Sequence, residues 1–209
     1  MNPLDRLYVD LDDVIGETAQ RLLVMAEQEY GLRVPFEEVT SFDLDAVFGM
    51  DAEETADFYR RSNEADVLSG VALREGAVES LAACRARGIE VWVVTGRPAA
   101  SRELTRAWLA DRGVPHDELV FVDKYGKMQQ EEAFPVDPAG LLSLEELADL
   151  EFGAAVEDHL GMARILAGSM RTPVMLMDRP WNRDPEADAH PLITRCRDWQ
   201  AVMAALGIG

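Results

Sequence analysis

Five short apolar runs rich in β-branched residues recur along this 209-residue chain, and their recurrence is the strongest constraint on its fold. Most of them are separated by stretches whose apolar residues have helical spacing. This alternation of strand-like and helix-like segments predicts an α/β architecture built on a parallel sheet. The segments expected to form strands are residues 7–11, 89–94, 119–122, 154–156 and 174–177.

Two of the intervening helices have clear predicted ends. Residues 77–87 are followed by Gly88, and residues 101–112 are followed by Gly113. Glycine is the residue most often found just past the end of a helix, because it adopts the left-handed conformation there without strain. These two segments are therefore expected to be crossover helices that pack on the sheet.

Residues 16–75 interrupt the alternation and are expected to be helical throughout. They contain a helical stretch at 17–30 that ends at Gly31, a helix start at Pro35, and a further helical stretch at 51–61, with no convincing strand between them. About sixty residues are more than one crossover between parallel strands needs. We therefore predict a small helical insertion that could close over a site as a lid.

The composition is strongly acidic, with a formal net charge of −19 and a pI near 4.4. Affinity for nucleic acids rests largely on Lys and Arg side chains that neutralise phosphates, so a polymeric nucleic-acid partner is not expected. The same charge would repel a small phosphorylated molecule at long range. Phosphate chemistry in this chain would therefore need a metal ion and a few locally placed cations.

The sequence gives no sign of a membrane or secretory role. No apolar run reaches the roughly 18 residues of a membrane-spanning helix, and the start MNPLDRLYVDLDD lacks a basic region followed by an apolar run. We expect a cytoplasmic protein with no membrane partner. Cys84 and Cys196 lie far apart in segments that look helical, which favours reduced core thiols over a disulfide.

Polar side chains follow the first four predicted strands at the points where the strands end. In open parallel sheets, ligands bind beyond the carboxyl ends of the strands, so these residues should converge on one cleft. They are Asp10, Asp12 and Asp13 at the first strand, Thr95, Gly96 and Arg97 after the second, Asp123 and Lys124 after the third, and Glu157 and Asp158 after the fourth.

The first of these sets has the chemistry of a phosphoryl-transfer site. Asp10 and Asp12 alternate with Leu11, so both carboxylates should point the same way. Two like charges this close need a cation or a proton, and Mg²⁺ is usually held by one or two carboxylates together with substrate phosphate. Asp158 would be a further ligand. One carboxylate can attack phosphorus and form an aspartyl phosphate, while the other protonates the leaving alcohol and later deprotonates water.

The second and third sets supply groups that bind phosphate. Thr95 offers a hydroxyl, and Gly96 permits close approach of a backbone N–H. A lysine after the third strand would offset the negative charge of Asp10 and of the phosphoryl group. The chain has two lysines, Lys124 and Lys127, beside eighteen arginines. Lys124 directly follows the strand and is favoured for this role, with Lys127 as the alternative.

Taken in order, these sets resemble the four motifs of the haloacid dehalogenase-like (HAD) phosphatases. They read Asp10-Leu11-Asp12-Asp13-Val14, then Thr95-Gly96-Arg97, then Lys124, then Glu157-Asp158. The resemblance covers about residues 5–180 and implies a Rossmann-like, doubly wound core formed by residues 1–15 and 76–209. It also places the insertion, residues 16–75, where that family has its helical C1-type cap.

The resemblance implies a role for each motif residue. Asp10 would be the nucleophile and Asp12 the general acid and base. The implied Mg²⁺ ligands are Asp10, the Asp12 backbone carbonyl and Asp158, with Glu157 as a further candidate. The implied phosphate contacts are Thr95, Gly96, Arg97 and Lys124.

Within the family, the segments YVDLDDVIGET and VMLMDRPWNR are similar to the 5′(3′)-deoxyribonucleotidase-like branch. This similarity implies hydrolysis of a small phosphorylated metabolite, with a nucleoside 5′-monophosphate as the leading substrate. About thirty residues separate Lys124 from the acidic pair, which is longer than the link this branch often has.

Two other classes of function remain open. A receiver-like phosphoacceptor module also combines acidic residues, a Thr or Ser and a Lys at strand ends, but receivers are shorter, lack a lid insertion and take phosphate on a central strand, where this chain has Thr95. A non-catalytic HAD-like binding protein is disfavoured because every catalytic position is filled. The aromatic residues with an open role, either packed or lining a pocket, are Phe42, Phe48, Phe58, Tyr59 and Trp181.

Overall fold

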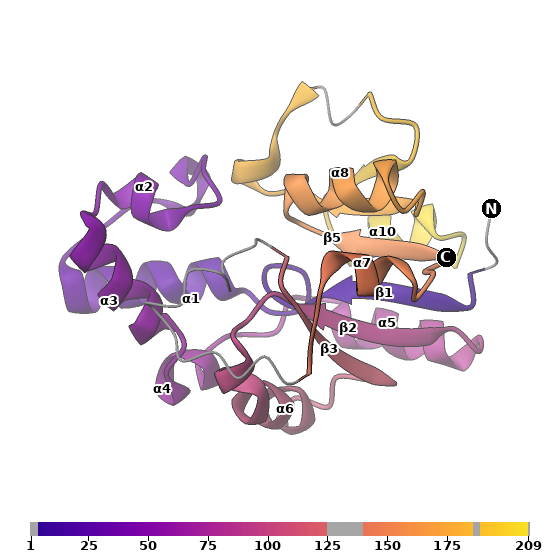
Figure 1. The fold of residues 1–209 in the computed structure, drawn as a ribbon, viewed down its shortest axis with the longest axis horizontal. Coiled ribbons are helices and arrows are strands. Elements are labelled where there is room, and N and C mark those ends of the chain that lie inside the picture. The colour runs from indigo at the N-terminus through magenta and orange to yellow at the C-terminus, as the bar shows by residue number, and fades with distance from the viewer. Residues whose placement is uncertain (1–3, 125–139, 186–188, 209) are drawn as a thin grey trace.

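A computed structural model describes residues 4–124, 140–185 and 189–208, and within them the chain forms one parallel sheet (Figure 1). The strands are β1 (Arg6–Asp10), β2 (Glu90–Thr95), β3 (Glu118–Val122), β4 (Leu141–Leu142), β5 (Ala154–Glu157), β6 (Val174–Met177) and β7 (Ile193–Cys196). They lie in the order β4-β3-β2-β1-β5-β6-β7, and every neighbouring pair is parallel. The α/β prediction is confirmed.

The sheet is doubly wound, because the chain first builds outward from β1 to β4 and then returns to place β5 on the other side of β1. The point between β1 and β5, where the direction of winding reverses, is where open α/β sheets bind ligands. The two strands pair in register, with Tyr8 opposite Ala155 and Val9 opposite Val156. Their carboxyl ends therefore lie side by side.

Alternation along β1 sends its side chains into two separate cores. Leu7 and Val9 pack in the core on one face of the sheet, and Tyr8 packs in the core on the other. The first face is covered by α5 (Ala77–Ala86), α6 (Arg102–Asp111) and α10 (Trp199–Ala205), and the second by α7 (Leu144–Ala148) and α8 (Leu160–Gly168). The short 3₁₀ segments of this region are η3 (Ala99–Ser101) and η5 (Pro180–Asn182).

The insertion after β1 forms a helical cap that projects beyond the end of the sheet (Figure 1). Its elements are α1 (Thr18–Met25), the π-helical η1 (Ala26–Tyr30), the 3₁₀ segment η2 (Phe36–Glu38), α2 (Leu44–Phe48), α3 (Ala52–Ser62) and α4 (Ala65–Ser69). The predicted helix end at Gly31 is confirmed, since this residue caps η1 with a φ of 68°. The cap has a small core of its own, centred on Phe58.

The two chain segments that enter and leave the cap are held together. The N–H of Glu17 donates to Ala72 O at 2.9 Å, and the N–H of Arg74 donates to Ile15 O at 2.8 Å. Gly16 sits at this crossing, where a Cβ atom would come within 2.9 Å of the Val71 side chain, so glycine permits the close approach. The division of the chain at residues 16 and 75 stays a prediction.

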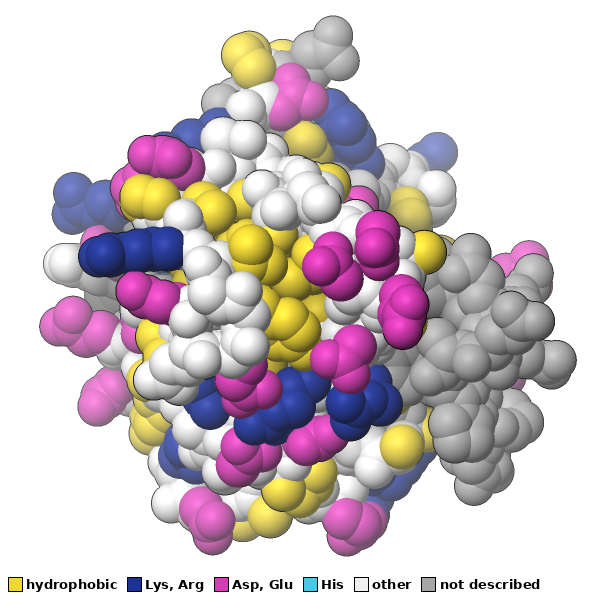
Figure 2. All heavy atoms as spheres, turned by 90° about the vertical axis from the view of Figure 1, so that its left-hand side faces the viewer, with side chains coloured by type: hydrophobic (Ala, Val, Ile, Leu, Met, Phe, Trp, Pro, Cys, Tyr) yellow, Lys and Arg dark blue, Asp and Glu magenta, His cyan; other side chains and the backbone are white. Residues whose placement is uncertain are grey.

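Seen from the cap side, the molecule carries a group of hydrophobic side chains in the middle of this face, with acidic and basic side chains around it (Figure 2). The cap also carries an ion-pair network in which Arg61 of α3 donates to both Glu29 and Asp66. No helix among the described residues has the length and apolar character that crossing a membrane requires.

Two predictions made from the sequence differ from the structure. Cys196 was expected in a helix but lies in β7, where its side chain packs in the same core as Leu7 and Val9. β4 and β7 were not predicted, because β4 has only two residues and β7 lacks a continuous apolar run. Cys84 and Cys196 are both buried free cysteines, as expected.

Candidate active site

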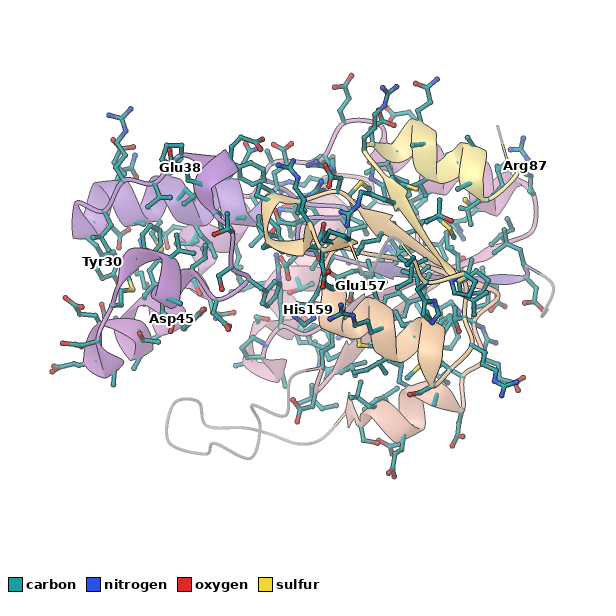
Figure 3. All side chains as sticks on the ribbon, turned by 90° about the horizontal axis from the view of Figure 1, so that it is seen from above. Tyr30, Glu38, Asp45, Arg87, Glu157 and His159 are labelled. Atoms are coloured by element: carbon teal, nitrogen blue, oxygen red, sulfur yellow. The ribbon has the colours of Figure 1, made fainter. Side chains whose placement is uncertain are left out.

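A cavity of about 860 Å³ lies between the carboxyl ends of β1 and β5 and the cap. Figure 3 shows Glu157 and His159 at this end of the sheet, with Asp45 on the cap beyond them and Arg87 at the far end of the molecule. The predicted site residues that line this cavity are Asp10, Asp12, Asp13, Gly96, Arg97, Asp123 and Asp158. Residues after four strands thus converge on this cavity, whereas Thr95, Lys124 and Glu157 are buried and are not among its lining residues.

Lys124 is the buried centre of this cluster. Its Nζ lies 2.5 Å from Asp10 Oδ1 and 3.1 Å from Glu157 Oε1, and its side chain is fully buried. The Tyr8 hydroxyl also donates to Glu157 Oε1, at 3.2 Å, and the ammonium lies 5.2 Å from the Tyr8 ring centroid. Lys124 is therefore fixed against the Asp10 carboxylate. Lys127, the alternative for this role, lies outside the described residues.

Asp10, Glu157 and Asp158 form a group that could hold a metal ion. Each offers a carboxylate oxygen, and these oxygens lie within 4.8 Å of one another. Burial, with the nearby Glu157 charge, raises the pKa of Asp10 to about 8 and raises that of Asp158 well above its usual range. A divalent cation would relieve this crowding of buried negative charge, and oxygen donors are what Mg²⁺ prefers.

Asp12 is held differently from Asp10. Arg97 contacts it through both Nε and Nη2, the latter 2.6 Å from Asp12 Oδ1, and the Thr18 hydroxyl donates to the same oxygen at 2.5 Å. Burial acts to raise the pKa of Asp12, but the Arg97 guanidinium outweighs it, so the pKa lies below its usual value. Asp12 is thus an ion-paired carboxylate that contacts both the core and the first turn of the cap.

The loop after β1 is held by residues that follow β6. Asp13 has a φ of 58°, a left-handed conformation that Asp tolerates better than most residues, and its carboxylate accepts from the N–H of Ala19 at 3.1 Å. The buried Arg179 donates to the backbone carbonyl of Asp13. Burial and the neighbouring Arg74 lower the pKa of Arg179 to about 10.

Thr95 at the end of β2 and two residues that follow β6 support the site from beneath or beside the cavity. Thr95 is fully buried and its hydroxyl accepts from the N–H of Arg97 at 3.2 Å. Trp181 lines the cavity and donates through Nε1 to Asp158 Oδ2 at 2.9 Å, while the buried Asn182 donates to Asp158 O at 2.7 Å. These two residues after β6 therefore position Asp158.

The aromatic residues of the cap divide into two groups. Phe58 is fully buried in the cap core, and Phe48 packs against it with ring centroids 5.8 Å apart. Phe42 and Tyr59 line the cavity. The Phe42 ring lies 4.3 Å from the His159 ring, so it links the cap to the residue that follows Asp158.

Two residues that contact the candidate site were missed from the sequence. Thr18 had no signal beyond its place at the start of a predicted helix. Arg179 did have one, because it is a cation two residues past the end of a predicted strand, where the other site residues were found.

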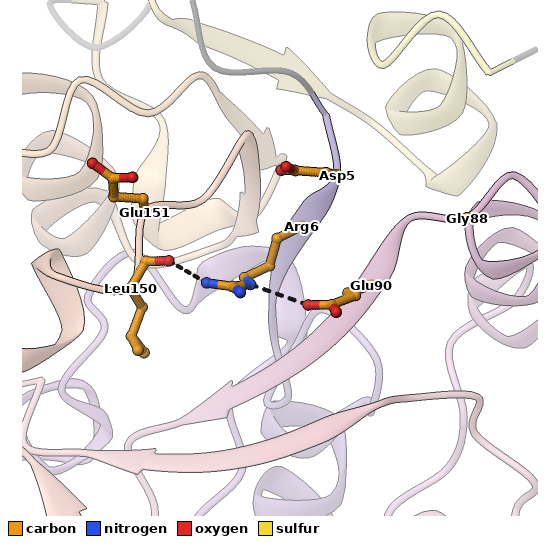
Figure 4. Close-up of a pocket in the computed structure, with 6 residues that line it drawn as sticks. All are labelled: Asp5, Arg6, Gly88, Glu90, Leu150 and Glu151. Carbon is orange, nitrogen blue, oxygen red and sulfur yellow. Dashed lines mark hydrogen bonds and ion pairs between the residues drawn. The ribbon is translucent and has the colours of Figure 1, made fainter.

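A second cavity, of about 300 Å³, opens at the other end of the sheet, where Arg6 contacts Glu90 and the Leu150 carbonyl (Figure 4). Its lining brings together none of the predicted site residues.

Solved structures of other proteins share this fold. Among solved structures, a predicted phosphatase from Clostridium acetobutylicum superposes with a TM-score of 0.61 at 13% identity, covering 98% of this chain and 100% of that one. A HAD family hydrolase from Deinococcus radiodurans R1, with bound phosphate and sodium, superposes with a TM-score of 0.55 at 18% identity, covering 99% and 97%. These likenesses show the HAD fold.

Comparisons of sequence identify the family of the chain. A candidate nucleotidase of Halalkalibacterium halodurans, BH1399, is 24% identical over 188 residues, which is 86% of this chain and 83% of that protein. The model of the family described as 5′ nucleotidase, deoxy (Pyrimidine), cytosolic type C protein matches residues 3–141. The chain therefore belongs to this nucleotidase family of HAD-like phosphatases.

Proposed function

We propose that this chain hydrolyses small phosphomonoesters in the presence of Mg²⁺, with Asp10 as the nucleophile. The observation that carries the proposal is the pairing of Asp10 with the fully buried Lys124, at the floor of a cavity that also receives Asp158. A lysine in this position offsets the charge of the carboxylate as it approaches a phosphate dianion.

The donor set fits Mg²⁺, since the carboxylates of Asp10 and Asp158 are hard oxygen ligands in one cluster. We propose these two side chains and the Asp12 backbone carbonyl as the ligands. Glu157 lies in the same cluster but also accepts from Lys124 and Tyr8, which favours a supporting role. When bound, Mg²⁺ would offset charge on the phosphoryl group and orient it for attack.

In the proposed reaction, an Asp10 oxygen forms a bond to phosphorus as the bond to the leaving oxygen breaks. A protonated Asp12 gives its proton to the leaving alcohol. Asp12, now a carboxylate, then takes a proton from water, whose oxygen attacks phosphorus and frees Asp10 and inorganic phosphate. Because Arg97 favours the charged form of Asp12, this pair must loosen when the substrate binds.

The phosphate oxygens are proposed to bind the Thr95 hydroxyl, the Gly96 N–H and Lys124. Arg97 lines the same cavity, so we propose that it adds positive charge beside the phosphate once its pairing with Asp12 has loosened. Closing of the cap would exclude water and strengthen these electrostatic contacts.

A nucleoside 5′-monophosphate is the leading substrate, and the cytoplasm the proposed location. Membership of a nucleotidase family supports the substrate, as does a cavity whose volume lies in the range that holds a ligand of this size. Phe42, Tyr59 and Trp181 offer aromatic surface within reach of a base.

The direct test is release of inorganic phosphate from p-nitrophenyl phosphate with Mg²⁺ and with excess EDTA. We expect turnover only with the metal, and a panel of phosphorylated metabolites then ranks the substrates. A receiver-like module would instead take up one phosphate per chain without turnover, and a binding protein would do neither. Either of those results would overturn the proposal.

A further inference from the structure

We propose that the cavity selects phosphomonoesters whose organic part carries no second anionic group, so that bisphosphates and phosphorylated acids are poor substrates. This inference rests on the proposed function and concerns the end of the cavity that would hold the leaving group. It follows from the different ways in which charge is arranged at the two ends of the cavity.

At the core end, acidic groups are accompanied by buried cations. Lys124 contacts Asp10, Arg97 contacts Asp12, and Arg179 binds the backbone of the loop after β1. Together with a bound divalent metal, these cations allow one phosphate to approach Asp10 in spite of the surrounding carboxylates.

At the cap end, three aspartates line the cavity: Asp43, Asp45 and Asp51. Asp45 accepts from the Tyr59 hydroxyl at 2.9 Å, and Asp51 accepts from backbone N–H groups of α3. Within the part of the chain that the structure describes, the partners of Asp45 and Asp51 are therefore neutral groups, which leave the charge of these two carboxylates uncompensated. Of the described residues that line the whole cavity, eight are aspartates and one, Arg97, is a cation.

The sequence outside the described residues does not reverse this balance. Residues 125–139 contain one lysine, Lys127, and three acidic residues, so even if this segment approached the cavity its net charge would be negative. A cavity of about 860 Å³ is roughly 12 Å across if spherical. A second anion inside it would therefore lie within about one Debye length of the cap carboxylates, where screening is weak.

Neutral groups meet no such penalty. The hydroxyls of a sugar and the amino groups of a base can donate to the carboxylates of Asp43 and Asp45. Apolar side chains of the cap line the same cavity, among them Leu44 and Met50, and provide a surface for the faces of a ring. The cap end is thus suited to a neutral, hydrogen-bonding organic group of a monoester.

The test compares matched substrates that differ by one phosphate: thymidine 5′-monophosphate with thymidine 3′,5′-bisphosphate, and glucose 6-phosphate with glucose 1,6-bisphosphate. In each pair that is hydrolysed, we expect kcat/KM for the bisphosphate to be lower by about tenfold or more at low ionic strength. In the double variant Asp43→Asn/Asp45→Asn, the ratio of kcat/KM for the monophosphate to kcat/KM for the bisphosphate should fall by about threefold or more. Each amide keeps an acceptor oxygen but loses the charge.

A control with the same change in net charge is Asp111→Asn/Asp149→Asn, since both residues are exposed and neither lines the cavity. This control should leave the ratio unchanged. Bisphosphates hydrolysed as well as monophosphates, or a ratio that the cap variant does not alter, would overturn the inference.

A measurement of substrate binding can test this inference even if the proposed function is wrong. In Asp10→Asn with Mg²⁺, calorimetry should show thymidine 5′-monophosphate binding more tightly than the bisphosphate. If the wild-type chain hydrolyses no phosphomonoester, the proposed function is wrong. The dissociation constants of the monophosphate and the bisphosphate can still be compared, and their ratio shows whether the cavity disfavours a second anionic group. Equal or tighter binding of the bisphosphate would contradict it.

Discussion

The core and cap ends of the cavity differ in how deeply their side chains are buried and in the partners that hold them. At the core end, the side chains of Lys124 and Glu157 are fully buried and joined by an ion pair, so few other positions are open to them. At the cap end, Phe42 is 36% exposed, and Asp45 has a neutral hydroxyl partner. This difference indicates that the core end fixes reacting groups, while the cap end presents a surface that can adapt to the leaving group.

The largest effect should come from Asp10→Asn, which leaves a near-isosteric side chain that is a poor nucleophile and a poor metal ligand. We expect kcat to fall by at least about 10³-fold while the circular dichroism spectrum stays unchanged. Measured turnover above a few percent of wild type would mean that Asp10 is not the nucleophile.

Removal of the paired ammonium should have the next largest effect. Lys124→Ala leaves buried negative charge at Asp10 and Glu157 without its cation, so kcat should drop by about 10² to 10³-fold. Lys127→Ala is the matched control and should lose much less activity. If the order is reversed in a steady-state assay, Lys127 has the role assigned to Lys124.

Most of the core end could be predicted from the sequence, because it depends on local rules. Strand ends in a parallel sheet converge, and this rule alone brought Asp10, Lys124 and Asp158 to one edge. The pairing of Asp12 with Arg97 was not predicted, since the two residues are 85 positions apart and only the packed structure decides which acid meets which base.

The cap was harder to predict in detail. Its helical character followed from spacing and stop signals, such as the one at Gly31. The roles of its aromatic residues depended on tertiary packing: Phe58 forms the cap core, whereas Phe42 faces the cavity. Helical spacing gives both residues the same pattern, so it could not separate these roles.

Metal binding should stabilise the core end in a way that depends on pH. Buried carboxylates have raised pKa values, about 8 for Asp10 and about 7 for Asp13, so the folded state binds more protons than the unfolded state above pH 4. Stability without metal should therefore fall as pH rises from about 4 to about 8. Mg²⁺ at about 100 times its Kd should raise Tm by about 5 to 10 °C at pH 8.

The rise in Tm should be smaller at pH 6, because protons then compete with the metal for the same oxygens. Thermal unfolding at both pH values, with NaCl at matched ionic strength as the control, checks this expectation. An equal rise at the two pH values, or an equal rise in Asp10→Asn/Asp158→Asn, would place the bound metal elsewhere.

The smallest effect is expected at the cap. Phe42→Ala removes apolar surface from the cavity, so KM should rise about two- to tenfold for a nucleoside monophosphate, with little change for p-nitrophenyl phosphate. Leu104→Ala is the matched control, because Leu104 is also 36% exposed but does not line the cavity. A uniform loss on all substrates would assign Phe42 a structural role only.

The central claim, that Asp10 carries the phosphoryl group during turnover, can be tested by trapping it. A substrate with a ³²P-labelled phosphoryl group is mixed with the enzyme and Mg²⁺, quenched with acid within milliseconds, and digested at low pH. We expect transient label on the peptide that contains Asp10, which decays as inorganic phosphate appears, and no label in Asp10→Asn. Inorganic phosphate that forms in the first turnover with no label on this peptide at any time would contradict it.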